Sequence, residues 1–192
     1  SSSEVCRAKL VEPEESIPLV IPDPFNPRYS YSAGKIITEM LAIHNAKNFE
    51  RLLICRPFNI YGPGMADGHV IPDFAEQLKY CSTVFRILGS GDETRSFCYI
   101  DDFIDGYMLM RDKGKHLGIY NIGTPVETTI AELAYKMAAI AGKQIILRTG
   151  DELREGDAPR RKPDISKLAA LGYKPKVNLT EGLTRTIKAW TP

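Results

Sequence analysis

Tyr31 and Lys35 lie four residues apart in the segment YSYSAGKIITEM, whose apolar residues repeat at helical spacing. Because residues four apart lie on one face of an α-helix, the Lys35 ammonium can sit beside the Tyr31 phenol and favour its phenolate form. A tyrosinate is a base that can take the proton of a substrate hydroxyl. The pair therefore indicates acid–base chemistry at a hydroxyl group, although the same spacing is also typical of two solvent-facing helix residues.

Five further motifs accompany this pair in a fixed order along the chain. SSSEV opens the chain at residues 1–5, and RPFNIYGPG follows the helical segment at residues 56–64. The remaining motifs are GSGDETRSFCYIDD at 89–102, YNIG at 120–123 and PRRKPDISKLAALGYKP at 159–175. Together with Tyr31 and Lys35, this series resembles the extended short-chain dehydrogenase/reductase family, which includes nucleotide-sugar epimerases, dehydratases and decarboxylases. The resemblance covers essentially the whole chain.

The resemblance implies an α/β fold, made of the C-terminal part of a Rossmann-type parallel sheet and a smaller α/β substrate-binding lobe. We expect residues 1–65 to belong to the Rossmann part. Residues 66–192 should form mainly the lobe, with some strands and helices returning to the sheet. The family places a segment of about a hundred residues before the position of Ser1, and a glycine-rich loop in that segment binds adenosine and pyrophosphate. No such glycine-rich loop occurs in these 192 residues. We therefore expect a missing N-terminal Rossmann segment as a partner, and weak NAD binding by the chain alone.

The family also implies roles for the Tyr31 pair and for the opening serine. Tyr31 would remove the proton of the sugar 4-hydroxyl as a hydride leaves C4 for NAD, and Lys35 would hold the nicotinamide ribose. The hydroxyl of Ser2, with Ser1 and Ser3 as alternatives, would contact the same sugar hydroxyl. The product is a 4-keto sugar, from which epimerisation, dehydration or loss of a C5 carboxylate can follow.

Glu4 and its neighbour help to distinguish dehydration, epimerisation and decarboxylation as the second chemical step. Sugar 4,6-dehydratases of the family place an aspartate before this glutamate, whereas this chain has Ser3. A hydroxyl residue followed by glutamate resembles the uronate decarboxylases, which also use an arginine at the position of Arg161. We therefore expect Glu4 to be catalytic in an epimerase or a decarboxylase, against the alternative of a solvated carboxylate. The chain departs from the family at Cys6 and Arg7, where the family usually has tyrosine and glycine.

Other residues match ligand-binding positions of the family. The resemblance places residues at the nicotinamide (Pro57 and Phe58), at the sugar diphosphate (Asn59) and, through the backbone, at the nucleotide base (Val70). Arg95 follows a glycine-containing turn, and Arg161 lies in the densest basic cluster of the chain. Because a guanidinium fork suits bidentate pairing with phosphate oxygens, we expect both arginines to bind the diphosphate of a nucleoside-diphosphate sugar.

Composition limits the other classes of function. The chain has 25 basic and 24 acidic residues, a net charge of +1, which gives no electrostatic reason to expect a nucleic acid or an anionic membrane as partner. No apolar run approaches the ~20 residues of a membrane span. The 4 cysteines and 3 histidines are scattered without metal-ligand spacing. We therefore expect no metal site and reduced thiols, as in a cytoplasmic protein.

Hydrophobic periodicity predicts alternating helices and strands after a strand end at residues 1–5 and a proline-rich loop up to residue 28. The expected helices cover residues 30–48, 71–81, 101–113, 129–141, about 164–172 and 180–190. The expected strands cover residues 51–57, 84–88, 95–100, 120–123 and 143–148. Thr129 and Glu132 have the spacing of a capping box. Other helix caps are expected at Asp101 or Asp102, Asp164 and Thr180.

These observations favour an NAD-dependent nucleotide-sugar enzyme that acts as an epimerase or a decarboxylase. Family members usually form homodimers by packing the helix of the Tyr31 type with a neighbouring helix. The alternative is a truncated, non-catalytic binding or assembly module that retains the sugar-nucleotide lobe.

Overall fold

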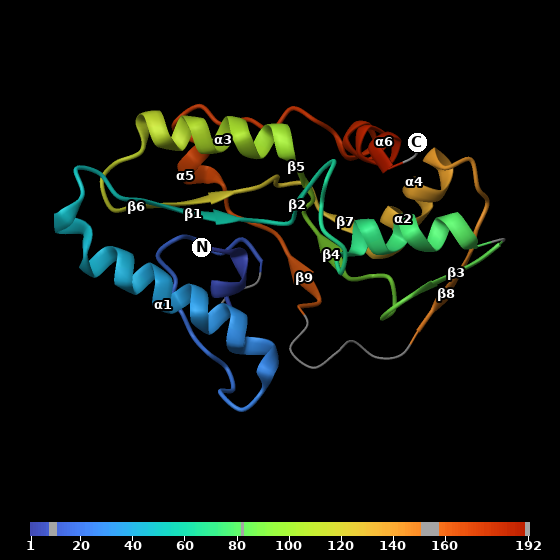
Figure 1. Cartoon of the computed structure of the whole chain (residues 1–192), viewed down its shortest axis with the longest axis horizontal. Coiled ribbons are helices and arrows are strands. Elements are labelled where there is room, and N and C mark those ends of the chain that lie inside the picture. Colours follow the sequence, from blue (N-terminus) through green and yellow to red (C-terminus); the bar gives the residue numbers. More distant parts are fainter. Residues whose placement is uncertain (8–10, 82, 151–157, 191–192) are drawn as a thin grey trace.

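Two groups of elements lie side by side along the long axis of the molecule, as Figure 1 shows. The structure is a computed structural model, and it describes residues 1–7, 11–81, 83–150 and 158–190. One group is built around a pair of parallel strands, and the N-terminus of the chain lies beside these strands in space. The other group is built around three helices and contains the largest apolar core.

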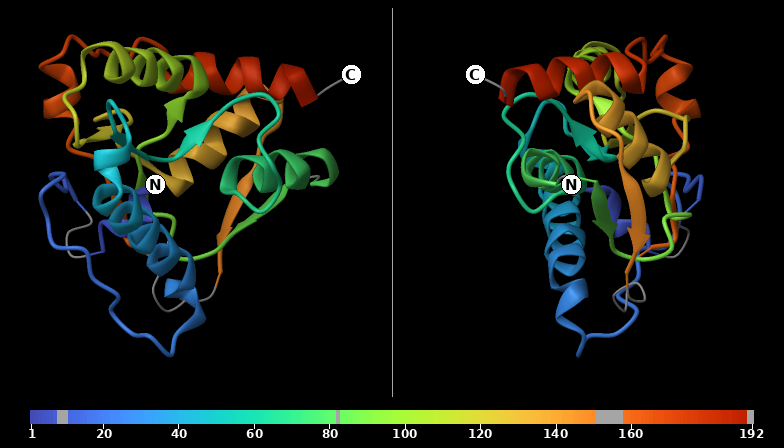
Figure 2. Two further views of the ribbon diagram at one scale, coloured as in Figure 1. Left: turned by 60° about the vertical axis from the view of Figure 1, so that its left-hand side comes forward. Right: turned by 90° about the vertical axis from the view of Figure 1, so that its right-hand side faces the viewer.

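The first group has three layers. Strands β1 (Leu53–Pro57) and β6 (Gly118–Ile122) pair in parallel, residue by residue from one end to the other. Helix α3 (Ile100–Lys113) covers one face of the pair, and helix α1 (Ser30–His44) lies on the opposite side, in all views of Figure 1 and Figure 2. Parallel strands require a crossover connection. Here α3 lies in the connection that runs from β1 to β6. The expected α/β fold is confirmed.

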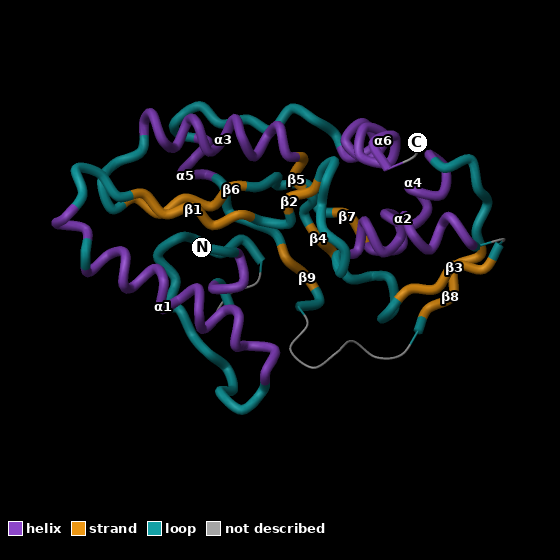
Figure 3. Tube along the Cα trace, in the orientation of Figure 1, coloured by secondary structure: helices purple, strands orange, loops and turns teal. Residues whose placement is uncertain are grey.

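Shorter strand pairs continue from this sheet toward the second group, as the orange segments of Figure 3 show. Strand β2 (Ile60–Tyr61) follows β1 and pairs in parallel with β5 (Cys98–Tyr99). At the far end, β3 (Val84–Ile87) pairs in parallel with β8 (Ile146–Thr149). The chain therefore crosses between the two groups several times, and distant parts of the sequence meet in the middle.

A three-stranded sheet lies at this middle position. Strand β4 (Thr94–Arg95) pairs antiparallel with β7 (Thr128–Thr129) and parallel with β9 (Arg160–Arg161). The turn before β4 is held by the Glu93 carboxylate, which accepts hydrogen bonds from the Ser90 and Gly91 backbone N–H groups at 3.0 and 2.9 Å. These bonds fix where β4 begins.

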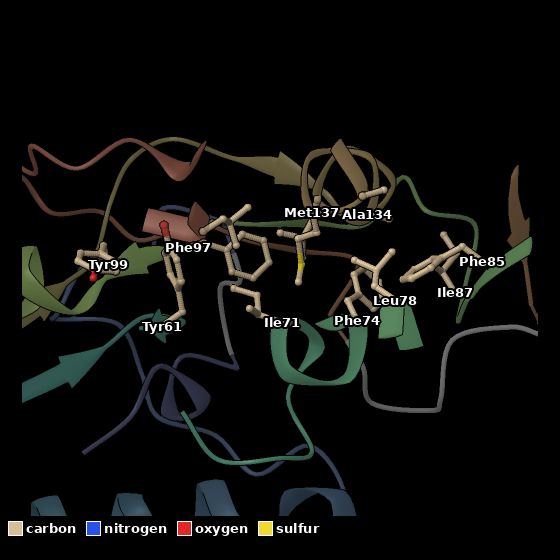
Figure 4. Close-up of a cluster of buried hydrophobic side chains, with 13 residues drawn as sticks. Tyr61, Ile71, Phe74, Leu78, Phe85, Ile87, Phe97, Tyr99, Ala134 and Met137 are labelled. Carbon is tan, nitrogen blue, oxygen red and sulfur yellow. The ribbon is translucent and has the colours of Figure 1, made fainter. Parts of the chain in front are cut away.

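The second group buries its side chains between three helices. Helices α2 (Val70–Tyr80), α4 (Ile130–Ile140) and α6 (Leu179–Trp190) pack around the core drawn in Figure 4. Phe74 and Phe85 meet edge to face with ring centroids 5.0 Å apart, a favoured aromatic geometry. Within the described ranges, no helix is both long and apolar enough to cross a membrane.

The remaining helices are short. They are the 3₁₀ turns η1 (Ser3–Val5), η2 (Pro27–Tyr29) and η3 (Ala46–Asn48), and the single-turn helix α5 (Ser166–Ala169). The prediction of a strand end at residues 1–5 was therefore wrong, because Ser3–Val5 form η1 and the two residues before them lie in no strand. The helix predicted over 30–48 ends at His44, and η3 follows it as a separate turn.

A buried ion pair ties α1 to β1. The Arg56 guanidinium donates to both carboxylate oxygens of Glu39, with Nε–Oε1 at 2.8 Å and Nη2–Oε2 at 2.7 Å. Arg56 also donates to the backbone carbonyl of Glu15 at 3.1 Å. Burial would raise the pKa of Glu39, but the hydrogen bonds and charge of Arg56 outweigh it and lower that pKa. Because both side chains are almost fully buried, each needs the other to stay charged in the interior.

Three further element predictions differ from the structure. The strand expected over 95–100 is divided into β4 and β5, which have different partners. Neither Asp101 nor Asp102 caps α3; the buried Asp102 carboxylate instead accepts from the backbone N–H groups of Lys176 and Val177. Asn178, not Thr180, accepts from the first turn of α6.

Two predicted cap positions agree with the structure. Thr129 and Glu132 form the capping box at the start of α4. Asp164 accepts from the backbone N–H of Ser166 at 2.8 Å, in the first turn of α5. These caps satisfy backbone donors that have no partner inside the helix.

We expect Arg56→Ala to lower the free energy of unfolding by about 3 to 5 kcal/mol, because it leaves the Glu39 carboxylate buried without a partner. Chemical denaturation monitored by circular dichroism measures this change. Lys79→Ala breaks the exposed pair with Glu76 and should leave stability nearly unchanged. Equal effects of the two substitutions would contradict the structural role given to Arg56.

Candidate active site

The opening residues form a short turn that carries Ser2 and Glu4. Ser2 precedes η1, and its Oγ accepts a hydrogen bond from the Glu4 backbone N–H at 3.3 Å. Val5 and Cys6 anchor the turn, because both are buried against Ile36 and Phe58. Burial raises the pKa of the Cys6 thiol to about 11, so this thiol stays protonated near neutral pH and is a poor nucleophile.

Glu4 lies between two arginines that are far apart in the sequence. One carboxylate oxygen, Oε2, pairs with Arg7, and the other, Oε1, pairs with Arg161 on β9. Burial would raise the pKa of Glu4, but the charge and hydrogen bond of Arg161, followed by the charges of Arg7 and Arg28, lower it below its usual value. The alternative interpretation of Glu4 as a solvated carboxylate does not fit these contacts, because two guanidinium groups pair with it.

Arg161 and Arg95 are direct neighbours in the sheet. The two residues are partners in the parallel register of β4 and β9, so both side chains leave the sheet on the same side. Arg161 is buried, and its Nε has no hydrogen-bond partner among the described residues. Arg95 is half-buried and donates to the Thr94 carbonyl at 2.8 Å. Two arginines from separate segments therefore start from paired positions on one face of the sheet.

Asn59 joins this arrangement through the backbone of Ser96. The Asn59 side-chain amide donates to the Ser96 carbonyl at 3.4 Å, and the Ser96 N–H donates to the Arg161 carbonyl at 3.2 Å. Asn59 has a φ of 42°, in the left-handed region where asparagine is better tolerated than most residues. The turn between β1 and β2 thus sets Asn59 beside the two arginine strands.

Tyr31 and Lys35 occupy the first turns of α1. The Lys35 ammonium lies 5.4 Å from the centroid of the Tyr31 ring, so the expected proximity is present, with the cation over the ring. Tyr31 is 56% exposed, which leaves its hydroxyl accessible to a ligand. The opposite face of α1 is anchored by Ser32, Ile36 and Glu39.

The other predicted ligand residues lie at the ends of elements. Pro57 ends β1, and the Phe58 side chain is fully buried in the core with Val5. A ligand contact of Phe58 would therefore use its backbone. Val70 is the first residue of α2 and packs partly against the large core. Nothing in the described contacts joins Val70 to the cluster around Glu4.

Sequence reasoning did not assign a role to Arg7 or Tyr29. The Arg7 guanidinium carbon lies 5.3 Å from the centroid of the Tyr29 ring, within the range of a cation–π interaction. Arg7 therefore connects the Glu4 turn to the residues directly before Tyr31. The sequence did contain one signal for Arg7, because the family usually has glycine at this position.

Comparison with known proteins gives a family match over the first part of the chain. Residues 1–123 match the family described as the NAD dependent epimerase/dehydratase family. UDP-glucuronic acid decarboxylase 5 of Arabidopsis thaliana is 36% identical over 188 residues, which are 95% of this chain and 54% of that protein. UDP-glucuronic acid decarboxylase 1 of Xenopus tropicalis is 31% identical over 97% of this chain and 45% of that protein.

A solved structure is also similar to this chain over nearly its whole length. The UDP-glucuronic acid 4-epimerase of Bacillus cereus, in complex with UDP-glucuronic acid and NAD, superposes with a TM-score of 0.84 at 27% identity. The match covers 98% of this chain and 59% of that one. The chain thus spans about half the length of the curated relatives it matches.

Proposed function

The chain belongs to the NAD-dependent epimerase/dehydratase family, and on that premise we propose that the complete protein is an NAD-dependent nucleotide-sugar enzyme. It oxidises the sugar at C4 to a 4-keto intermediate and then either inverts a centre or releases the C5 carboxylate. The relatives named above, decarboxylases and an epimerase of UDP-glucuronic acid, support this class of substrate. The observation that carries the proposal is the contact of Glu4 with Arg161, which joins two predicted site residues 157 positions apart.

The residues on α1 fit one part of NAD. Lys35 offers only N–H donors and Tyr31 a hydroxyl, both suited to ribose hydroxyl oxygens, and they lie together on an accessible face. NAD, when bound, accepts a hydride from the substrate and later returns it. We propose that Pro57 and the Phe58 backbone lie near the nicotinamide, since Phe58 follows the end of β1 and packs against Val5 and Cys6 of the opening turn.

In the first step, we propose that Tyr31 takes the proton of the sugar 4-hydroxyl while C4 loses a hydride. Lys35 stabilises the tyrosinate by its charge, and the Ser2 hydroxyl donates a hydrogen bond to the same sugar oxygen without giving up its proton. Removal of one proton and one hydride leaves a C4 carbonyl. The Ser2 turn and α1 are held together by the Arg7 contact with Tyr29, which supports a shared substrate.

In the second step, the C4 carbonyl can accept the electron pair left at C5 when a carboxylate departs as CO₂. C5 then takes a proton, and hydride return to C4 regenerates the hydroxyl. Arg161 forms an ion pair with Glu4, a predicted catalytic residue. This contact supports a position of the Arg161 side chain near the sugar ring. Without loss of CO₂, hydride return to the opposite face of C4 gives the epimer.

The diphosphate of the substrate is proposed to lie along β4 and β9. Arg95 and Arg161 project from paired positions of these strands, and Asn59 is attached to the same backbone. Two cations match the roughly two negative charges of a diphosphate, and the guanidinium fork matches its oxygens. Val70, at the start of α2, is proposed to meet the nucleotide base through its backbone.

A homodimer is proposed through α1. Its outward face carries exposed apolar side chains, with Ile37 55%, Met40 52% and Leu41 60% exposed. These positions follow the i, i+3, i+4 spacing of one helix face. An apolar stripe of this kind on a helix is typical of a helix–helix interface.

Tyr31→Phe should lower turnover of the complete protein on a nucleoside-diphosphate sugar by about 10² to 10⁴, because a general acid–base is lost. Affinity for the sugar nucleotide should change little. Steady-state kinetics and calorimetry measure the two quantities. Tyr29→Phe keeps the ring beneath Arg7 and serves as the control. Turnover within a factor of two of the unmodified protein would show that Tyr31 is not the base.

Arg95→Ala should weaken binding of a nucleoside diphosphate about ten- to a hundredfold, because a charge-assisted hydrogen bond contributes about 1.5 to 3 kcal/mol. Arg161→Ala should do the same and, if decarboxylation is the second step, should also lower saturating turnover on a uronate. Calorimetric titration and kinetics test both variants. Unchanged affinity in both would rule out the diphosphate assignment, whereas normal saturating turnover in Arg161→Ala would favour epimerisation.

Leu41→Asp should shift the complete protein from dimer to monomer in sedimentation velocity, because it places a charge in the proposed α1 interface. Leu88→Asp alters a similarly exposed leucine, 63% exposed, outside α1 and should leave the dimer intact. A dimer that survives Leu41→Asp, or an unmodified protein that is monomeric, would exclude this interface.

A further inference from the structure

Arg7 occupies a position where the family that this chain resembles usually has glycine. A glycine at that position can offer only its backbone, whereas Arg7 extends a guanidinium group into the site. Its side chain is only 5% exposed. A desolvated cation is costly unless it is paired, so the contacts of Arg7 show what the residue is positioned to do.

Among the described residues, Arg7 contacts both the opening turn and the segment directly before α1. Its Nη2 donates to Oε2 of Glu4, and its guanidinium carbon lies 5.3 Å from the centroid of the Tyr29 ring. Glu4 belongs to the opening turn, and Tyr29 stands two residues before Tyr31. Arg7 thus links the predicted catalytic glutamate to the start of the helix that carries the predicted tyrosine base.

The Glu4 carboxylate is bracketed as a result. Arg7 takes one oxygen and Arg161 takes the other, so rotation about the last side-chain bond would break two charge-assisted hydrogen bonds. The charged groups that act on Glu4 are Arg161 from β9, Arg7 from its own turn and Arg28 from η2. All three are cations, and their combined field disfavours protonation of Glu4.

This arrangement limits the chemistry of Glu4. A carboxylate held by two guanidinium groups is a poor proton donor near neutral pH, but its remaining lone pairs can accept a hydrogen bond or a proton. The Glu4 side chain is 21% exposed, so a substrate group can reach it. Without the Arg7 guanidinium, Glu4 would keep its ion pair with Arg161 and lose its second one among the described residues.

We propose that Arg7 is a positioning residue of the reaction proposed above: it fixes Glu4 between two guanidinium groups, in register with α1, so that Glu4 acts as an anion and not as a proton donor. The inference rests on the proposed function for its catalytic meaning. Its structural part, the effect of Arg7 on Glu4, is independent of activity.

The first test is a titration of Glu4 by ¹³C NMR, with Glu4→Gln to assign its signal. In Arg7→Gln the Glu4 midpoint should rise by about one pH unit or more, because an opposite charge in contact is removed. Arg7→Lys keeps the charge and should leave the midpoint near that of the unmodified protein. Arg160→Gln removes the same charge from an exposed arginine paired with Glu127 and should have no effect.

The second test is the pH profile of kcat in the complete protein. The main acid limb belongs to Tyr31, the proposed base, and a second loss of kcat at lower pH should follow protonation of Glu4. In Arg7→Gln this second loss should move to higher pH by the same amount as the Glu4 midpoint, since the reaction needs the Glu4 anion. In Arg7→Lys the pH at which kcat is lost through protonation of Glu4 should not change. The maximal kcat should fall about tenfold, because an ammonium cannot reproduce the guanidinium fork that aligns Glu4. Should Arg7→Gln fail to fold, as judged by circular dichroism, Arg7→Lys carries the test.

The outcomes separate the two proposals. An unmoved Glu4 midpoint in folded Arg7→Gln, or unmodified kcat in Arg7→Lys, would overturn the role of Arg7. A protein without activity on nucleoside-diphosphate sugars would overturn the proposed function, while the NMR titration would still decide whether Arg7 controls Glu4.

Discussion

Pairing of buried charge is the constraint on which the arrangement of the site depends. Glu39 and Arg56 are almost fully buried and bind each other at 2.7 Å, which fixes α1 against β1. The ion pair of Glu4 with Arg161 fixes the opening turn against β9 in the same way. Because removal of one partner leaves an uncompensated charge in a poorly solvated place, these contacts define one register between distant segments. The positions of Tyr31 and Arg95 follow from that register.

The placement of the acidic and basic groups explains how one site can serve a reaction with changing charge. Tyr31 and Lys35 lie on an accessible face of α1, where a proton can be exchanged with a substrate. Arg161 is buried, and Arg95 is half-buried. In the proposed reaction, proton transfer at Tyr31 is thus separated from anion binding at the arginines. A reaction that passes through a carbonyl and a carbanion needs this combination of a mobile proton and fixed cations.

The sequence predicted the elements well where the signal was local. The Thr129 capping box, the β1 strand and the Tyr31 helix follow from spacing and periodicity alone. Asp102 was misread because its carboxylate binds Lys176 and Val177, a tertiary contact that no local pattern reveals. The pairing of Glu4 with Arg161 could be expected only from the family resemblance, since 157 residues separate them. Arg7 was noticed as a departure, but its contact with Tyr29 depends on the fold.

The central claim is that the sugar is oxidised and reduced at C4, and the fate of the hydrogen on C4 tests it most directly. The complete protein would be incubated with NAD and UDP-glucuronic acid carrying deuterium at C4, and the product examined by NMR. The account predicts a decarboxylated or C4-epimeric product that retains deuterium at C4, because the hydride is removed and returned within the site. Recovery of unchanged substrate, or a product whose C4 deuterium has been replaced by hydrogen from water, would contradict it.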